Sequence, residues 1–472
     1  MILKRFYDDF LAQASFLIGC ERTREAIVID PNRAIRTYTD AADDSRLKIT
    51  AVTETHIHAD FLSGAGELAE NQNAELWLSG MGGKDWSYAP RLDLKVRTLS
   101  DGDVISVGTL RFEVVHTPGH TPEHIVLMVT DTAVSNEVLG AFTGDFIFVG
   151  DVGRPDLLEK AAGVAGTMRA GAATLYKSIQ RFSRLPDYLQ IWPGHGAGSA
   201  CGKSLGAMPQ TTLGYEKLVN WAFNARGEAE FVETVLAGQP DPPLYFARMK
   251  QMNRDGVPRR PASSLLPELS DSRLKELVDS HAVVIDTRHV DIYAQGFLPG
   301  TINIPFNKSF VNWAGSIIPY DQDFYLIVDS PEESRLAEGR AALQLIGLDR
   351  VAGYASAGAL ERMAQSGEKL SVMPQVSITD LNGMKGIQVL DVRTATEHRE
   401  GHIVGSTGLA LQSLAETLDQ LDPNTPVAVH CAGGTRSAIA ASLLSSRGFR
   451  DVSNVTGGFD AWVKAGLPVE KP

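Results

Sequence analysis

The sequence has few cysteines and no long apolar run. Only three cysteines occur in 472 residues, namely Cys20, Cys201 and Cys431. So small and odd a number predicts no disulfide framework, and without a CxxC pair no structural zinc site is expected. A reducing compartment such as the cytoplasm suits this composition. Because no stretch of about 18 apolar residues exists, no transmembrane helix is expected either.

Positively charged residues are fewer than negatively charged ones. Lys and Arg number 44 against 57 Asp and Glu, which gives a net charge of −13. A surface of this sign repels nucleic acids and anionic membranes, so neither is expected as a main partner. Residues 1–9 reach acidic side chains before any apolar stretch, so no signal peptide is expected. The length predicts two to four domains.

The first half of the chain alternates short apolar strands with turns. Residues 26–30 and 49–53 are typical of buried strands, and residues 110–115 alternate like a half-buried one. Polar motifs follow several of these strands, where loops carry functional side chains on a rigid scaffold. Residues 238–267 are rich in proline and have little periodicity, which predicts a strap or linker between domains.

The second half contains an internal repeat. Residues 286–288 read Asp-Thr-Arg and residues 391–393 read Asp-Val-Arg, and in both copies a glycine follows 10 and again 14 residues after the aspartate. Each copy continues with an apolar strand, at 324–328 and 427–430, and then with a helical stretch. This alternation predicts a small parallel-sheet α/β domain that is present twice.

Four segments of the first half carry candidate metal ligands. Imidazole suits zinc, iron and copper, while two histidines and one carboxylate with open positions suit non-haem Fe(II). The segments are His56-x-His58-x-Asp60, Thr117-Pro118-Gly119-His120, Thr143-Gly144-Asp145 and Trp192-Pro193-Gly194-His195-Gly196.

In this order the four segments resemble the metallo-β-lactamase superfamily, which implies an αββα sandwich over roughly the first half of the chain. Hydrolytic members with two metal ions usually read HxHxDH, but here the last position is Phe61. A phenyl ring cannot ligate a metal, so a second ion would lack one ligand. This departure favours a site with one metal ion.

The segments resemble the persulfide dioxygenase branch of that superfamily. This resemblance implies one Fe(II) per chain, held by His56, His120 and Asp145, with positions left for water, O₂ and a sulfur substrate. The resemblance also implies a set of residues that orient the ligands and water without binding the metal. These residues are His58, Asp60 and His195.

Residues 150–156 also resemble persulfide dioxygenases. Within them, Arg154 either binds a substrate carboxylate or orders the site through Asp156. A purely structural ion pair between these two residues is an equally open interpretation.

Cys431 lies between an apolar strand and a clear helix, in a glycine-rich loop that Arg436 closes. A cysteine at a helix N-terminus has its thiolate favoured, and inward-pointing amides can stabilise a persulfide. This Cys-x4-Arg loop is similar to the rhodanese active loop. Tyrosine phosphatases use Cys-x5-Arg, so the tighter spacing favours sulfur over phosphate.

In the first copy of the repeat, aligning the strand ends places Asp329 where Cys431 stands in the second copy. An aspartate cannot relay sulfur, and residues 330–334 contain no glycine. We therefore expect a structural rhodanese-homology domain there.

The two other cysteines differ in context. Cys20 ends an apolar strand and is expected to be a buried core thiol. Cys201 lies six residues after His195, in a glycine-rich loop beside Lys203. It is either a surface thiol without function or a reactive thiol near the metal that carries a persulfide.

The whole chain resembles bacterial persulfide dioxygenase–sulfurtransferase fusions. The expected fold is an αββα sandwich with its strap at 1–258, a cysteine-less rhodanese-homology domain at 259–369 and an active rhodanese domain at 370–472. The resemblance implies oxidation of a low-molecular-weight thiol persulfide by O₂ to sulfite, and transfer of sulfur through Cys431 to sulfite to make thiosulfate. It also implies a homo-oligomer.

Two alternatives remain open from the sequence. One is a thioester hydrolase of the glyoxalase II kind with two zinc ions, fused to a rhodanese. The other is a sulfur-carrier or sensor protein in which the lactamase fold serves only for assembly.

Overall fold

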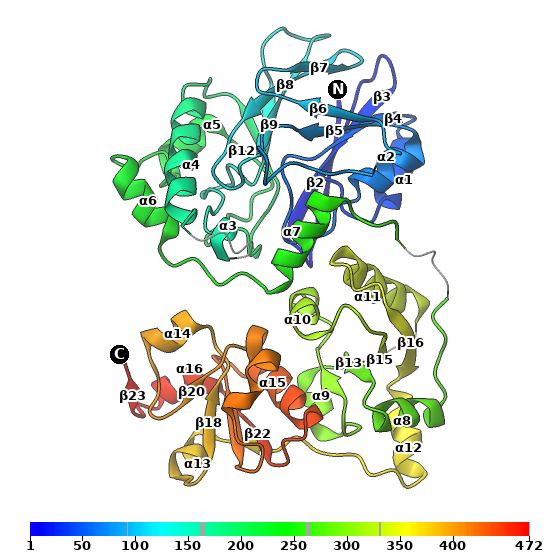
Figure 1. Cartoon of the computed structure of the whole chain (residues 1–472), viewed down its shortest axis with the longest axis vertical. Coiled ribbons are helices and arrows are strands. Elements are labelled where there is room, and N and C mark those ends of the chain that lie inside the picture. Colours follow the sequence, from blue (N-terminus) through cyan, green and yellow to red (C-terminus); the bar gives the residue numbers. More distant parts are fainter. Residues whose placement is uncertain (92, 161–165, 261–264, 330–331, 472) are drawn as a thin grey trace. The chain divides into compact units, whose positions relative to one another are not determined.

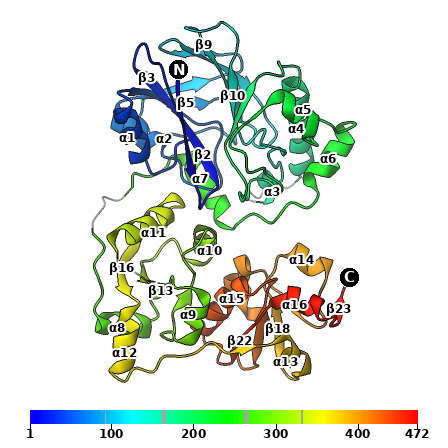
Figure 2. The ribbon, with the colours of Figure 1, turned by 180° about the vertical axis from the view of Figure 1, so that it is seen from behind.

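The computed structural model describes residues 1–91, 93–160, 166–260, 265–329 and 332–471 (Figures 1 and 2). The chain divides into two compact units. Unit 1 contains Met1–Arg260 with Leu345–Gly347, and unit 2 contains Pro261–Gln344 with Leu348–Pro472. Among the described helices, none has both the length and the apolar character that crossing a membrane requires. The predicted boundary after residue 258 lies two residues from the end of the first unit's main segment.

Unit 1 is built on two six-stranded sheets that face each other. In the first sheet the order is β1 (Ile2–Asp8), β2 (Gln13–Gly19), β3 (Glu25–Ile29), β4 (Lys48–Thr53), β5 (Glu75–Ser79) and β6 (Val96–Leu99). In the second sheet the order is β12 (Thr211–Thr212), β11 (Gln190–Pro193), β10 (Gly140–Gly144), β9 (Ile125–Asp131), β8 (Leu110–His116) and β7 (Val104–Val107). One core of buried side chains from both sheets, Cys20 among them, fills the space between.

Helices cover the outer face of each sheet in unit 1. Helices α1 (Arg36–Asp44) and α2 (Ala65–Gln72) pack on the first sheet, and α4 (Met168–Phe182) and α6 (Glu228–Leu236) pack on the second. Between them along the chain lie α3 (Leu157–Lys160) and α5 (Leu213–Val219). The layers are therefore αββα, as the sequence predicts. Strand β2 is buried along its whole length because both of its faces lie against apolar layers.

The proline-rich segment contains a helix. Helix α7 (Tyr245–Asp255) belongs to unit 1 and has five buried residues. The prediction of a strap or linker between domains over 238–267 is therefore wrong for these eleven residues, which form a helix of unit 1. Residues 261–264 of that segment lie outside the described residues.

Unit 2 contains two parallel sheets that share the order of four strands, and the second sheet has a fifth strand at its edge. The first sheet runs β14 (Ile302–Asn303), β13 (Val283–Asp286), β15 (Phe324–Val328) and β16 (Val351–Ser356). The second runs β20 (Thr407–Gly408), β18 (Gln388–Asp391), β21 (Val427–His430), β22 (Val452–Val455) and β17 (Gln375–Val376). The first sheet's helices are α8 (Asp271–Asp279), α9 (Val290–Gln295), α10 (Phe310–Ile317), α11 (Glu333–Leu345) and α12 (Gly358–Gln365). The second sheet's helices are α13 (Ile378–Gly383), α14 (Ala395–Glu400), α15 (Thr435–Ser446) and α16 (Gly458–Lys464), and β19 (His402–Ile403) pairs with β23 (Val469–Glu470).

The two copies share a buried ion pair as well as their topology. Arg288 binds Asp286 through two nitrogens and donates to the carbonyl of Gly296 at 2.9 Å. Arg393 binds Asp391 in the same way and donates to the carbonyl of Gly401 at 2.7 Å. This explains the repeated Asp-x-Arg and its glycine, because the pair fixes the turn after each first strand. Division of unit 2 at residue 369 remains a prediction.

Candidate metal centre and sulfur-transfer loop

His56, His120 and Asp145, here called the triad, meet in the interior of unit 1. They follow strands β4, β8 and β10, whose ends lie together. Nε2 of His56 is 3.8 Å and Nε2 of His120 is 3.6 Å from Oδ2 of Asp145. All three side chains are buried, and their ligand atoms lie within 4.8 Å of one another. The structure thus brings together the three predicted ligands.

Hydrogen bonds fix which nitrogen each histidine presents. The Thr55 hydroxyl donates to Asp30, so Nδ1 of His56, 3.0 Å from that hydroxyl, must donate to it. Nδ1 of His120 lies 3.0 Å from the carbonyl of Arg154, which can only accept. Both Nε2 atoms therefore face the triad without a proton, which is the form that binds a metal.

The charges of the triad also suit a cation. Burial lowers the pKa of His56 well below its usual value and lowers that of His120 to about 3, so both rings are neutral. Burial raises the pKa of Asp145 to about 6, and neither of its carboxylate oxygens has a hydrogen-bond partner among the described residues. Two neutral imidazoles and a buried, unpartnered carboxylate fit a metal ion.

A second cluster lies beside the triad, formed by Asp60, His195 and Cys201. Nε2 of His195 is 3.4 Å from both Asp60 and Asp145, and its Nδ1 donates to the carbonyl of Ala12. The argument that Phe61 leaves a second ion one ligand short is therefore wrong as stated, because Cys201 offers a third ligand. Sequence reasoning missed this since Cys201 lies 140 positions beyond Phe61 along the chain.

Cys201 is buried and contacts the metal centre. The interpretation of it as a surface thiol is wrong, since only 2% of the residue is exposed. Burial, Asp60 and Asp145 raise the pKa of its thiol well above the ordinary value. The Lys203 ammonium does not pair with the Cys201 thiol, because the ammonium donates to the carbonyls of Thr234 and Ala237.

His58 is bound by a carboxylate outside the triad. Its Nε2 lies 3.1 Å from Oδ1 of Asp30, and its ring packs against Phe61 with 4.5 Å between centroids. Burial alone would lower the pKa of His58, but Asp30 outweighs it and raises the pKa to about 9. His58 belongs to neither of the two candidate ligand groups that the described residues form.

Arg154 is bound by protein groups. It makes two hydrogen bonds to Asp156, at 2.8 and 2.7 Å, and donates to the carbonyls of Ala200 and Pro240. It is fully buried. Of the three open interpretations, the structure gives no support for a substrate carboxylate at Arg154. The ion pair with Asp156 fits a structural role and also an ordering role, because the Arg154 carbonyl accepts from His120.

Helix α7 contributes residues that sequence reasoning missed. Asn253 donates to the carbonyls of His58 and Phe61, at 2.8 and 2.7 Å, and accepts from the amide of Ser63. Lys250, one turn earlier, is buried, and its ammonium lies 4.4 Å from the centre of the Trp86 ring. The signal was present in the sequence, because Lys250 and Asn253 share a helical spacing with the buried Phe246 and Met249.

In unit 2, Cys431 lies between β21 and the N-terminus of α15. Its sulfur accepts from the amide of Gly434 at 3.0 Å, and the Ser437 hydroxyl lies 3.5 Å away. Gly434 has a φ of +118°, which favours glycine and lets its amide turn toward the sulfur. The predicted cradle for a sulfur anion is therefore present in part.

Arg436 is paired with a carboxylate. It donates two hydrogen bonds to Glu397, at 2.7 and 2.8 Å. Burial alone would raise the pKa of Glu397, but Arg436 outweighs it and holds that pKa at about 2. The prediction that Arg436 closes the loop stands as a proposal, since two of its five N–H donors bind Glu397 and three remain.

The first copy differs from the prediction at its strand end. Asp286 pairs with Ile327 in its ladder, and Asp391 pairs with His430 in the second copy. Val328 therefore occupies the position of Cys431, and the alignment with Asp329 is wrong by one residue. The error arose because β15 continues one residue further than β21. Residues 330 and 331 of the following loop lie outside the described residues.

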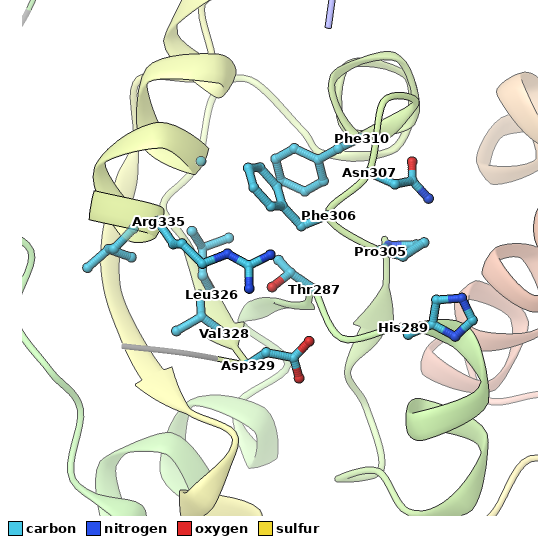
Figure 3. A pocket seen from close by; sticks show the side chains of 12 residues that line it. Thr287, His289, Pro305, Phe306, Asn307, Phe310, Leu326, Val328, Asp329 and Arg335 are labelled. Carbon is cyan, nitrogen blue, oxygen red and sulfur yellow. The ribbon is translucent and has the colours of Figure 1, made fainter. Parts of the chain in front are cut away.

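A cavity of about 120 Å³ opens at this strand end. Figure 3 shows the Arg335 guanidinium pointing toward Thr287, with Phe306 and Asp329 on either side. The first copy thus keeps a pocket at the carboxyl end of its sheet, where α/β folds usually bind ligands. Neither Val328 nor Asp329 can serve there as a sulfur-carrying nucleophile.

Comparison with known proteins decides the family. The model of the metallo-beta-lactamase superfamily matches residues 8–195. A solved structure, a metallo-beta-lactamase from Staphylococcus aureus subsp. aureus COL, is 42% identical, covers 75% of this chain and 99% of its own, and has a TM-score of 0.67. The chain belongs to the metallo-beta-lactamase superfamily. That match covers more residues than unit 1 contains.

The relatives of this chain include both a dioxygenase and hydrolases. Persulfide dioxygenase ETHE1 of Bos taurus is 27% identical over 201 residues, 41% of this chain and 68% of its own. A hydroxyacylglutathione hydrolase of Dictyostelium discoideum is 29% identical over 184 residues, 38% of this chain and 61% of its own. The model of the rhodanese-like domain matches residues 377–465, which include Cys431 and Arg436. A second rhodanese domain at 259–369 remains a prediction.

Proposed function

We propose that this metallo-beta-lactamase superfamily member is an iron-dependent persulfide dioxygenase coupled to a sulfurtransferase. It oxidises the persulfide of a low-molecular-weight thiol with O₂ to sulfite, and it converts sulfite and a further persulfide to thiosulfate. Together the two reactions consume persulfide and sulfite, which suits a role in sulfide detoxification in the cytoplasm. We expect a homo-oligomer.

The observation that carries this proposal is the triad. Two histidines and one carboxylate on one side of an ion form the ligand set that non-haem Fe(II) oxygenases share. Fe(II) would be held by His56, His120 and Asp145, and when bound it supplies coordination sites for O₂ and sulfur. His58 belongs to neither candidate ligand group of the described residues, so the triad has two histidines and not three.

The chain's own residues set up the first reaction. Thr55 and the carbonyl of Arg154 hold the two imidazoles in the ligand tautomer, and burial excludes bulk water from the carboxylate of Asp145. Cys201, a thiol beside Asp145, lies where it would contact a sulfur substrate. The overall change consumes one persulfide anion, one O₂ and one water, and it yields a thiolate, sulfite and two protons.

The second reaction is assigned to Cys431. Its thiolate attacks the outer sulfur of a persulfide, the S–S bond breaks and the low-molecular-weight thiolate leaves. Sulfite then attacks the outer sulfur of the Cys431 persulfide, so thiosulfate forms and the thiolate is restored. The Gly434 amide, already a donor to this sulfur, stabilises both anions.

A hydrolytic function is the second candidate, and the second cluster favours it. Asp60, His195 and Cys201 could hold a second ion beside the triad, as a thioester hydrolase with two zinc ions requires. The hydroxyacylglutathione hydrolase relative supports this alternative.

Substrate assays separate the two candidates. We expect the full-length protein, purified without oxygen, to consume O₂ when given glutathione persulfide and to leave S-lactoylglutathione intact. Hydrolysis of the thioester without O₂ uptake from the persulfide would replace the proposed function by the hydrolytic one.

A further inference from the structure

We infer that Lys250 and Trp86 form an anion-binding subsite in the metal centre, which holds the anionic sulfur of the persulfide and then the oxygens of sulfite. The identity of the anion rests on the proposed function, whereas the subsite itself rests on the geometry of α7.

Helix α7 presents one face to the metal-site loop. Asn253 on that face makes three hydrogen bonds to residues 58–63, as described above. Lys250 lies three residues earlier and so projects from the same face of the helix. The ammonium is therefore placed beside the loop that follows His56.

The Lys250 side chain is buried, with 4% of the residue exposed. Among the described residues, no recorded hydrogen bond involves its Nζ, which keeps a small exposed surface through which a ligand can reach it. Its recorded contact is the face of the Trp86 ring, at 4.4 Å. A ring face attracts a cation, but it does not replace the three acceptors that an ammonium binds in water.

The ammonium and the charged groups of the metal centre influence one another. Lys250 lowers the pKa values of His56 and His120, and Glu123, Asp145 and Cys201 act on Lys250 in turn. Burial lowers the pKa of Lys250 to about 8, so the ammonium form still prevails at neutral pH. The cation thus acts on the triad from the side of α7.

Glu123 does not satisfy this cation. Its Oε1 accepts from the amide of Ile57 at 2.8 Å, and its Oε2 has no partner among the described residues. Two opposite charges lie near each other without a direct bond. A buried charge in this condition is costly, and an anion that accepts from Lys250 would offset the cost.

The ligand that fits is a small anion that reaches the metal centre. A persulfide anion has its charge on the terminal sulfur, and sulfite has three oxygen acceptors. A neutral thioester has no such charge. The subsite therefore favours persulfide and sulfite over the substrates of the hydrolytic relatives.

Lys203 provides a matched control. It is a lysine of unit 1 whose ammonium also lies over an indole ring, 5.6 Å from the centre of Trp221. Its ammonium donates to the carbonyls of Thr234 and Ala237, so these protein groups, and not a ligand, accept its hydrogen bonds. Replacing it removes the same charge from the same domain without touching the proposed subsite.

The test measures sulfite binding by calorimetry, with full-length protein both as purified and after metal removal. All proteins carry Cys431→Ser, so that the rhodanese loop takes up no sulfur. We expect Lys250→Met to weaken sulfite binding about 10- to 100-fold in both forms, the loss of one charge-assisted hydrogen bond. Lys250→Arg should keep most of the affinity, and Lys203→Met should keep all of it.

Steady-state kinetics provide the second measurement. Because the ammonium holds substrate and transition state alike, Lys250→Met should raise the KM for glutathione persulfide more than it lowers kcat. If the Met variant does not fold, Lys250→Gln and Lys250→Arg are compared, and only the Arg variant should bind sulfite like the parent.

Unchanged sulfite affinity in a folded Lys250→Met or Lys250→Gln protein would overturn the subsite. A wild-type protein that takes up no O₂ from persulfide would overturn the proposed function and leave the sulfite result to stand by itself. The two failures are therefore distinguishable.

Discussion

Each histidine of the triad depends on a neighbour that fixes its tautomer. Thr55 can accept from His56 only because its own proton goes to Asp30, and Asp30 also binds Nε2 of His58. One carboxylate thereby orients the first histidine toward the triad and holds the second through a ring nitrogen. Both roles follow from the position of Asp30, 26 residues before His56.

Loss of a triad ligand should abolish the oxidation alone. We expect His56→Ala and Asp145→Ala to lose bound metal and to lower O₂ uptake at least 100-fold, because two ligands hold an ion far less tightly than three. Rhodanese turnover with thiosulfate and cyanide should stay within about twofold of wild type.

The control for that experiment is His116→Gln, since this histidine contacts the carbonyl of Pro122 and no member of the triad. It should keep both metal and O₂ uptake. Metal content by elemental analysis and an oxygen electrode give the readouts, and a His56→Ala protein that retains both would exclude the triad.

The residues that sequence alone could predict are those whose motif carries the chemistry. His56, His120, Asp145 and Cys431 stand in such motifs, and the structure brings the first three together. Lys250 and Asn253 have no motif, and their role depends on how α7 packs. The role of Cys201 could not be decided from the sequence for the same reason, because only the fold shows this thiol buried beside Asp60.

At the scale of elements, the strand and repeat patterns predicted the sheets well, while α7 was missed. Prolines at 240, 242, 243 and 258 surround it, and they obscure an eleven-residue helix. The one-residue error at Val328 has a similar origin. The end of an apolar run in the sequence does not show which residues of neighbouring strands pair. In the structure Asp286 pairs with Ile327.

Helix α7 should be needed to hold the metal-site loop. Asn253→Ala leaves the amide of Ser63 and the carbonyls of His58 and Phe61 without partners in a buried place. We expect the free energy of unfolding to fall by about 2–4 kcal/mol, with metal affinity falling as well. Urea unfolding measures the first effect. An Asn253→Ala protein as stable as wild type would show that these bonds are replaced by water.

The first copy of the repeat should not regain sulfur transfer from a single nucleophile. The position to test is Val328, so Val328→Cys is placed in a Cys431→Ser background. We expect less than about 1% of wild-type turnover with thiosulfate and cyanide, because the copy lacks the glycine amide that serves Cys431 and preorganised donors of this kind contribute several kcal/mol. Asp329→Cys is the matched control. Robust turnover from the Val328 variant would mean that the cavity with Arg335 still supports the chemistry.

At the scale of the whole molecule, the proposed function places two sulfur chemistries on one chain. A candidate metal centre lies in unit 1, and a thiol in a rhodanese-like loop lies in unit 2. In this proposal sulfite is the product of the first reaction and the acceptor of the second, so the chain as a whole would release thiosulfate.

Removal of the transferring thiol should change the product. Cys431→Ser is expected to release sulfite in place of thiosulfate while O₂ uptake stays near the wild-type rate, since the oxidation does not use that thiol. Chromatography of the products after derivatisation with bromobimane measures both anions. Thiosulfate formed at wild-type rates by this variant would move the transfer to another thiol, with Cys201 the first to be examined.

The central claim is that one Fe(II), bound by the triad, supports the oxidation. The most direct measurement is to titrate the metal-free full-length protein with Fe(II) in the absence of oxygen and then to record O₂ uptake on glutathione persulfide at each step. The rate should rise linearly and level off at one Fe(II) per chain, with no activity from Zn²⁺. A rate that requires two equivalents, or a zinc-loaded protein that hydrolyses thioesters without consuming O₂, would contradict the account.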